Sequence, residues 1–306
     1  MSALGSDSVS VVNCVRNLRG RSQAVLVQAS DGLFYVVKFA SSLEAANLPF
    51  NESGGSELYR ACKLQVPSWK PLLVTDGFLD RNPDCWMQTA EGRFRPEPGL
   101  YFGSRFLGGD GIRLLEILPG TGFKQLRNHE SFWLAWMVDI CAKHTGNRQA
   151  IFVEDAEGWF DAYFVNHGHL FASSEWEQQQ YFDASQYIDR RVYQCLFSQK
   201  RRNFPTVAGS VDVDQLWQRI EALPNDWKTA TTLKSFAECL DRLSDGKFLQ
   251  KILDRMMAFC QRTGEFESNE GQDEQRFPGQ VLYRGVQTAG IGRRLSTSRV
   301  NHPDCA

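Results

Sequence analysis

The sequence predicts an α+β fold of two lobes, in which a small β-rich N-lobe precedes a larger, mainly helical C-lobe. Residues 9–40 alternate between apolar and polar side chains as strands do, whereas apolar residues recur at helical spacing after residue 175. We therefore divide the 306 residues into an N-lobe at 1–98, a hinge region at 99–108, a helical C-lobe at 109–262 and a polar tail at 263–306.

The N-lobe contains three strand patterns, at residues 9–18, 24–30 and 33–40. Asp31-Gly32 separates the last two patterns and is typical of a hairpin turn. Residues 51–64 place apolar side chains on one face of a helix. The Trp-, Pro- and Gly-rich residues 68–100 predict short strands, one of them at 71–80.

The C-lobe follows residues 99–108, which predict a strand or a hinge. A long helix is expected at 129–144, and residues 145–153 form a turn that leads into a strand. Another strand ends at residues 163–165. Four helical segments come after it, at residues 176–200, 212–222, 231–243 and 246–262.

Bulk properties exclude several classes of protein. The net charge of -2 gives no general attraction to nucleic acid or to an anionic membrane, and no run of about 18 apolar residues predicts a transmembrane helix. The N-terminal residues lack the basic and apolar regions of a signal peptide. The eight cysteines lack the spacing of a zinc site, and we expect them to be reduced thiols. These properties predict a cytoplasmic protein without nucleic-acid or membrane partners.

Lys38 is the first candidate for a functional side chain, because it lies in an otherwise apolar strand. A buried ammonium group is costly unless it is paired. Two interpretations are open: Lys38 lies at a strand edge in water, or it points into a cleft toward phosphate oxygens. In the second case Glu52 on the next helix is its natural partner, with Glu57 as a substitute. Glu52 can instead complement the N-terminus of that helix.

Gly20, Ser22 and Gln23 form a polar turn between two predicted strands. Glycine allows a phosphate group to approach the backbone, and the serine and glutamine side chains add hydrogen-bond donors. The position of this turn shortly before Lys38 makes it a candidate for phosphate binding.

Residues 143–149 lie between the long helix and the next strand, where a two-lobed kinase has its catalytic loop. The loop offers Asn147, Arg148 and Gln149 but no carboxylate. The nearest carboxylate belongs to Asp139 in the preceding helix, where a structural hydrogen bond is favoured over catalysis.

Asn166 follows the strand that ends at residue 165, and it is the candidate metal ligand. It offers a neutral carbonyl oxygen, whereas magnesium prefers charged oxygen ligands. His167 and His169 are expected to shape the turn through hydrogen bonds, because no third zinc ligand is evident.

These short motifs together resemble the HipA-like kinases, a family with the protein-kinase-like fold. They occur in the family's order across residues 10–260, as RGRSQAVLV, DGLFYVVKF, NESGGSELYRACKLQVP, GLYFGSRFLG, CAKHTGNRQAIFV, YFVNHGHLF and LPNDW. The resemblance implies that the protein binds ATP and Mg²⁺. It places Ser22 and Gln23 in a phosphate loop, makes Lys38 the nucleotide lysine with Glu52 as its partner, and puts residues 99–106 beside the adenine.

The chain departs from the family at two positions, since relatives carry Asp where this sequence has Gly146 and Asn166. Losing a positioning or metal-binding group of this kind commonly costs about 2.7–4 kcal/mol of barrier. We therefore predict a nucleotide-binding protein with impaired or atypical phosphoryl transfer, similar to a pseudokinase. The alternative is an active ATP- and magnesium-dependent kinase for a protein Ser/Thr hydroxyl or a small molecule, with Asp139, Asp161 or Glu154 substituting. A structural protein is a third interpretation. Besides nucleotide, a protein substrate or partner is expected.

Overall fold

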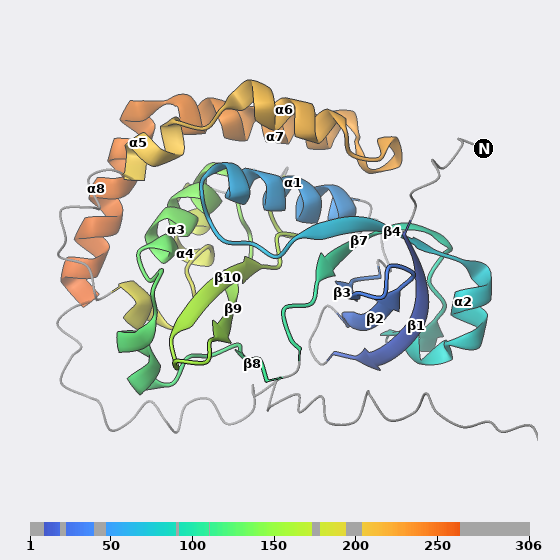
Figure 1. Ribbon diagram of the computed structural model, residues 1–306. Helices are drawn as coiled ribbons and strands as arrows, with labels where there is room; N and C mark the ends of the chain where they lie inside the picture. Colours follow the sequence, from blue (N-terminus) through green and yellow to red (C-terminus); the bar gives the residue numbers. More distant parts are fainter. Residues whose placement is uncertain are drawn as a thin grey trace, which may run out of the picture.

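The computed structural model describes residues 9–18, 23–39, 47–89, 92–109, 111–172, 178–193 and 204–263. A β-barrel forms the N-terminal lobe, and a small sheet with most of the helices forms the C-terminal lobe (Figure 1). The two predicted lobes of an α+β protein are therefore present. The polar tail at 263–306 lies outside the described residues, apart from its first residue at the end of the last helix.

The N-terminal barrel is closed by five strands, β1 (Val9–Asn17), β2 (Val25–Ala29), β3 (Phe34–Val37), β4 (Trp69–Val74) and β7 (Gly99–Arg105). Their order around the barrel is β1-β2-β3-β7-β4, and only β1 and β4 are parallel neighbours in it. Alternate residues point inward, so that Val25, Val27, Tyr35 and Val37 share one core. The three strand patterns at the start of the chain are confirmed.

The expected strand at 71–80 is only half correct. Strand β4 ends at Val74, and helix α2 (Asp76–Arg81) follows it. The Thr75 hydroxyl accepts a hydrogen bond from the backbone N–H of Phe78 at 3.2 Å, so Thr75 caps the helix. The short helix η2 (Pro83–Cys85) and the hairpin of β5 (Met87–Thr89) and β6 (Gly92–Phe94) complete this region.

Helix α1 (Leu48–Ala61) lies between the barrel and the C-terminal helices and packs against β7, α6 and α7 (Figure 1). It begins three residues before the predicted start at residue 51 and contains both Gly54 and Gly55. Every residue from Phe50 to Tyr59 is buried. An amphipathic pattern thus predicted the helix but not its burial on all sides.

The C-terminal lobe is built around β8 (Arg113–Leu115), β9 (Gln149–Glu154) and β10 (Phe160–Val165), an antiparallel sheet in the order β10-β9-β8. Its other elements are η3 (Gly120–Gln125), α3 (Ser131–Cys141), α4 (Gln178–Ala184), η4 (Arg190–Tyr193), α5 (Phe204–Gly209), α6 (Val213–Glu221), η6 (Asn225–Trp227), α7 (Ala230–Ser244) and α8 (Gly246–Thr263). The predicted helix at 176–200 is replaced by α4 and η4 in its described part.

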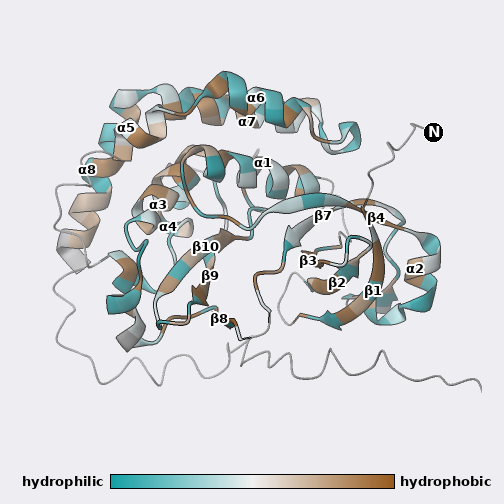
Figure 2. Cartoon of the chain, viewed as in Figure 1, coloured by the Kyte–Doolittle hydropathy of each residue, from teal (hydrophilic) through white to brown (hydrophobic). Residues whose placement is uncertain are grey.

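Burial follows the hydropathy of these elements. Helix α3 is almost wholly apolar and buried, whereas hydrophilic and hydrophobic residues alternate around α6, α7 and α8 (Figure 2). Leu216, Phe236 and Leu240 are examples of their inward-facing residues. Within the described ranges, none of the helices combines the length and the hydropathy that a bilayer crossing requires.

Candidate active site

Lys38 lies where the two lobes meet, one residue beyond the end of β3. Its Nζ donates a hydrogen bond to Glu52 Oε1 on α1 and another to Asn166 Oδ1 after β10, each at 2.5 Å. The Lys38 side chain is 17% exposed and that of Glu52 is 4% exposed. The ammonium group is thus paired and largely enclosed, and the interpretation with Lys38 in open water does not hold.

Glu57 does not share this role. Its carboxylate accepts hydrogen bonds from Trp69 Nε1 at 2.8 Å and from Arg219 Nη1 at 3.0 Å, and these contacts tie α1 to β4 and α6. Glu52 is therefore the partner of Lys38. A lysine from the third strand paired with a glutamate on the following helix is the arrangement of protein kinases. The predicted two-lobed, protein-kinase-like fold class is confirmed.

Two glycines allow α1 to approach the turn after β10. A Cβ atom on Gly55 would lie 2.6 Å from His167 Cβ and 2.6 Å from Leu170 Cδ1. On the other side of the contact, a Cβ atom on Gly168 would lie 2.5 Å from Leu48 Cδ1. A side chain at Gly55 would push the helix away from the turn because His167 Cβ cannot rotate aside, whereas a side chain at Gly168 would require the end of Leu48 to move.

The turn that contains Asn166 is held by α1 through its backbone. The backbone N–H of His167 donates to Glu52 Oε2 at 2.9 Å, and Asn51 Nδ2 donates to the Gly168 carbonyl at 2.9 Å. Asn166 itself has a φ of 64°, in the left-handed region that asparagine and aspartate tolerate better than most residues. Glu52 therefore binds both the lysine and the turn that presents Asn166.

Asp139 and Arg148 form a buried ion pair beneath this turn. Arg148 donates from Nε to Asp139 Oδ2 at 2.8 Å and from Nη2 to Oδ1 at 2.7 Å. The Tyr59 hydroxyl donates to Asp139 Oδ1 at 2.5 Å, and Arg148 Nη1 donates to the Val165 carbonyl at 2.9 Å. The Asp139 side chain is 0% exposed and the Arg148 side chain is 1% exposed. The arrangement gives both residues a structural role, as the sequence favoured for Asp139, and Arg148 supports the chain just before Asn166.

The buried network also fixes charge states. Burial raises the pKa of Asp139 above its ordinary value, although the positive charge and hydrogen bonds of Arg148 oppose this effect. Burial alone would lower the pKa of Arg148, but the charge and hydrogen bonds of Asp139, together with Tyr59 and Glu52, outweigh burial and raise that pKa. Burial and the nearby charge of Arg148 lower the pKa of His144 and His167 well below the usual value. Both imidazoles are therefore neutral near pH 7.

The loop at 143–149 lies beside the turn after β10, as expected. The Thr145 backbone N–H donates to the His169 carbonyl at 3.1 Å, and a Cβ atom on Gly146 would lie 3.1 Å from His169 Cδ2. Asn147 and Gln149 are exposed. Of the loop residues predicted to serve catalysis, Arg148 is thus committed to Asp139, while Asn147 and Gln149 face solvent.

The other two carboxylates that were expected to substitute, Asp161 and Glu154, lie elsewhere. Asp161 pairs with Arg127 at 3.2 Å, and Glu154 pairs with Arg113 at 2.9 Å. Asp161 precedes Asn166 by five residues on an extended strand, which corresponds to about 16 Å. Neither carboxylate can therefore act at Asn166 in place of an aspartate. No group of three or more potential metal-ligating side chains occurs among the described residues.

The predicted phosphate turn is described only in part. Gly20 and Ser22 lie outside the described residues. Gln23 has a φ of 42°, and its side chain bonds both to the backbone carbonyl and to the N–H of Gln88, each at 2.6 Å. The Gln23 amide is therefore engaged with β5 in this structure.

Gly55 and Tyr59 shape the site but were not predicted to do so, whereas Gly168 belongs to the polar turn that the sequence indicated. The sequence carried one signal for Gly55, because two consecutive glycines weaken a helix and are retained there for a packing reason. Tyr59 lies beside the apolar positions predicted for α1, and nothing in the sequence indicated its hydrogen bond to Asp139.

Comparisons with known proteins find similarity among solved structures. No family model matches the chain, and no curated protein matches it. The Helicobacter pylori proinflammatory kinase CtkA is 10% identical, with 80% of this chain and 95% of that chain covered and a TM-score of 0.49. The Golgi casein kinase is 11% identical, with 83% and 75% covered and a TM-score of 0.45. The same kinase with Mn/ADP bound is 11% identical, with 83% and 74% covered and a TM-score of 0.42.

Proposed function

We propose that the protein is a HipA-like, kinase-fold protein that binds a nucleotide but transfers phosphate poorly. One observation supports this proposal above the others: Lys38 Nζ is held between Glu52 on α1 and Asn166 after β10. A partly exposed ammonium group at the meeting of two lobes suits the phosphates of ATP. The hydrogen bond to Glu52 fixes the direction of that group.

The same cluster supports impaired transfer. Phosphoryl transfer needs a carboxylate to position the nucleophile and charged oxygens to hold magnesium. Gly146 has no side chain, Asn166 is neutral, and the Asn166 and Glu52 oxygens already accept hydrogen bonds from Lys38. The described residues therefore do not fit a dedicated magnesium site, and we expect ATP to bind with little dependence on Mg²⁺.

ATP titration of the full chain tests the binding, with the fluorescence of its eight tryptophans or calorimetry as the readout. The Lys38→Ala substitution is expected to weaken binding about tenfold or more, because a hydrogen bond to a charged group contributes about 1.5–3 kcal/mol. Lys70→Ala is the matched control, since Lys70 lies on β4 of the same lobe and pairs with Asp31 at 3.0 Å. Thermal unfolding checks that each variant is folded.

Two results would overturn the proposal. Equal ATP affinities for wild type and Lys38→Ala, or no ATP binding by the wild type, would remove the nucleotide site. Magnesium-dependent ATP turnover at ordinary kinase rates, lost in Lys38→Ala, would instead establish the active kinase alternative. Addition of EDTA separates these cases, because it leaves the proposed binding intact and abolishes ordinary phosphoryl transfer.

A further inference from the structure

A cavity of about 350 Å³ lies where α1 and β4 meet the end of α6. Small-molecule sites in proteins usually enclose about 300–1,000 Å³, so this cavity is large enough for a small ligand. Its lining consists of Glu57 and Arg60 of α1, Trp69 of β4, Arg219 of α6, and Ala222 and Leu223, which follow α6. None of them is among the residues that hold Lys38.

Glu57 gathers two guanidinium groups at this cavity. Its side chain is 9% exposed, and its carboxylate accepts hydrogen bonds from Arg60 Nη1 and, at 3.0 Å, from Arg219 Nη1. The Arg60 side chain is 35% exposed and that of Arg219 is 43% exposed, so both remain accessible to a ligand. One carboxylate faces two guanidinium groups, and the lining therefore carries one net positive charge.

Both guanidinium groups keep donors for a further anion. An arginine side chain has five N–H donors. Besides Glu57, Arg60 donates from Nη2 to the Pro67 carbonyl at 3.3 Å, and Arg219 donates from Nη2 to Gln215 Oε1 at 3.5 Å. Neither Nε donates to another side chain or carbonyl in the part of the chain that the structure describes. Guanidinium groups of this kind bind carboxylates well.

An apolar wall completes the cavity. The Trp69 ring is held by the rings of Phe102 and Trp227, with centroids 5.5 and 6.2 Å away, and its Nε1 is engaged with Glu57 at 2.8 Å. Leu223 is 4% exposed beside it. The cavity thus offers a positive charge next to a fixed apolar surface, which suits an acid with an apolar body.

We propose that this cavity binds a small organic monoanion, with its carboxylate between Arg60 and Arg219 and its aromatic or aliphatic body against Trp69 and Leu223. Burial alone would raise the pKa of Glu57, but Arg219, Arg60 and Trp69 outweigh burial and lower it. Glu57 therefore keeps its charge at neutral pH, and a monoanion balances the one positive charge that is left. This inference does not depend on nucleotide binding.

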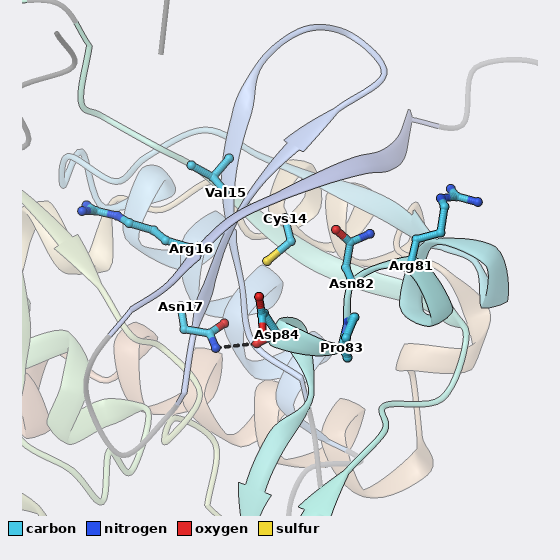
Figure 3. A pocket seen from close by; sticks show the side chains of 8 residues that line it. All are labelled: Cys14, Val15, Arg16, Asn17, Arg81, Asn82, Pro83 and Asp84. Carbon is cyan, nitrogen blue, oxygen red and sulfur yellow. Dashed lines mark hydrogen bonds between the residues drawn. The ribbon is translucent and has the colours of Figure 1, made fainter. Parts of the chain in front are cut away.

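A second cavity, of about 300 Å³, provides a control. Arg16 and Arg81 are among its lining residues, but their side chains point to opposite sides (Figure 3). They do not converge on one anion as Arg60 and Arg219 converge on Glu57. Arg81→Gln is therefore the matched charge control, because it removes an exposed arginine from a cavity of similar size.

Calorimetry of the full chain with phenylacetate tests the site, with 2-phenylethanol as the uncharged analogue and acetate as the analogue without a ring. Phenylacetate is expected to bind most tightly of the three. Arg219→Gln should weaken its binding about tenfold or more, the loss expected for one hydrogen bond to a charged group. Arg81→Gln should leave it unchanged.

A second variant tests the cavity without removing an arginine. Ala222 is exposed, so Ala222→Phe places a ring in the cavity while the ion pairs of Glu57 remain, and it should abolish phenylacetate binding. Ala230→Phe, at an exposed position on α7, is its control. Thermal unfolding checks that each variant is folded.

Several results would overturn the proposal. These are no phenylacetate binding by the wild type, equal binding of phenylacetate and 2-phenylethanol, or tighter binding of inorganic phosphate than of phenylacetate. Unchanged phenylacetate affinity in either Arg219→Gln or Ala222→Phe would overturn it too, and so would an equal loss in the control variants.

Discussion

Arg148 provides the sharpest test of which site residues are structural. The Arg148→Met substitution keeps much of the side-chain volume but removes two hydrogen bonds to Asp139 and one to the Val165 carbonyl. Asp139 would then be left 0% exposed, with only the Tyr59 hydroxyl at 2.5 Å and neutral His144 nearby. A buried charge that has lost its partner is a strong source of instability.

The expected loss is large relative to the stability of the whole protein. Removal of one partner from a buried ion pair costs about 3–5 kcal/mol. Native proteins are stable by about 5–15 kcal/mol, so Arg148→Met is expected to forfeit a large fraction of the total. By contrast, Arg113→Met breaks an ion pair with Glu154 in which the arginine is 58% exposed, and it is expected to cost about 1 kcal/mol or less.

Urea unfolding at neutral pH, monitored by tryptophan fluorescence, measures these differences. The Arg148→Met/Asp139→Leu double variant should lose less stability than the sum of the two single variants, because neither charge is then left alone. A loss below about 1 kcal/mol for Arg148→Met, equal to that of Arg113→Met, would refute the structural role. Arg148 would then belong with the exposed loop residues as a candidate for function.

Two further predictions concern the packing of α1 and the pH dependence of stability. Gly55→Ala is expected to cost about 1–3 kcal/mol of unfolding free energy because its Cβ would lie 2.6 Å from His167 Cβ. Gly54→Ala, whose Cβ meets ordinary contacts at 3.5 Å, should cost nothing in the same urea titration, and equal losses would contradict this. Burial raises the pKa of Glu116 in the folded protein to about 7, whereas its pKa in the unfolded chain is near 4.3. The uptake of a proton by Glu116 therefore stabilises the folded state fully below pH 4.3, and this stabilisation is lost as the pH rises through 7. Glu116→Gln should therefore exceed wild type in stability at pH 8, with an advantage that shrinks toward pH 5, and a pH-independent difference would contradict the raised pKa.

The predictable part of the site was the part with a strong local signal. Lys38 interrupted an apolar strand, so its need for a partner was visible in the sequence, and Glu52 on the following helix supplied one. The turn at Asn166 was visible because polar residues and a glycine ended a strand pattern. Contacts across many residues were not visible: nothing local to Gly55 indicates that α1 meets a turn more than a hundred residues later.

Local patterns also failed where two chemical interpretations were possible. Thr75-Asp76-Gly77 can be a turn within a strand pair or the cap and first turn of a helix, and the Thr75 hydroxyl selects the helix by accepting from Phe78. Arg148 was considered for catalysis because it lies in a polar loop. Only the fold shows that its side chain turns inward to Asp139, because the loop's sequence does not specify that direction.

The backbone at Gly146 and Asn166 shows whether the fold itself requires these two residues. Asn166 adopts a φ of 64°, which aspartate also tolerates. Gly146 does not use the left-handed conformations open to glycine, and the three atoms nearest to a Cβ there all belong to the His169 side chain, the first at 3.1 Å. A small movement of that side chain would accommodate it. The fold therefore demands neither glycine at 146 nor asparagine at 166.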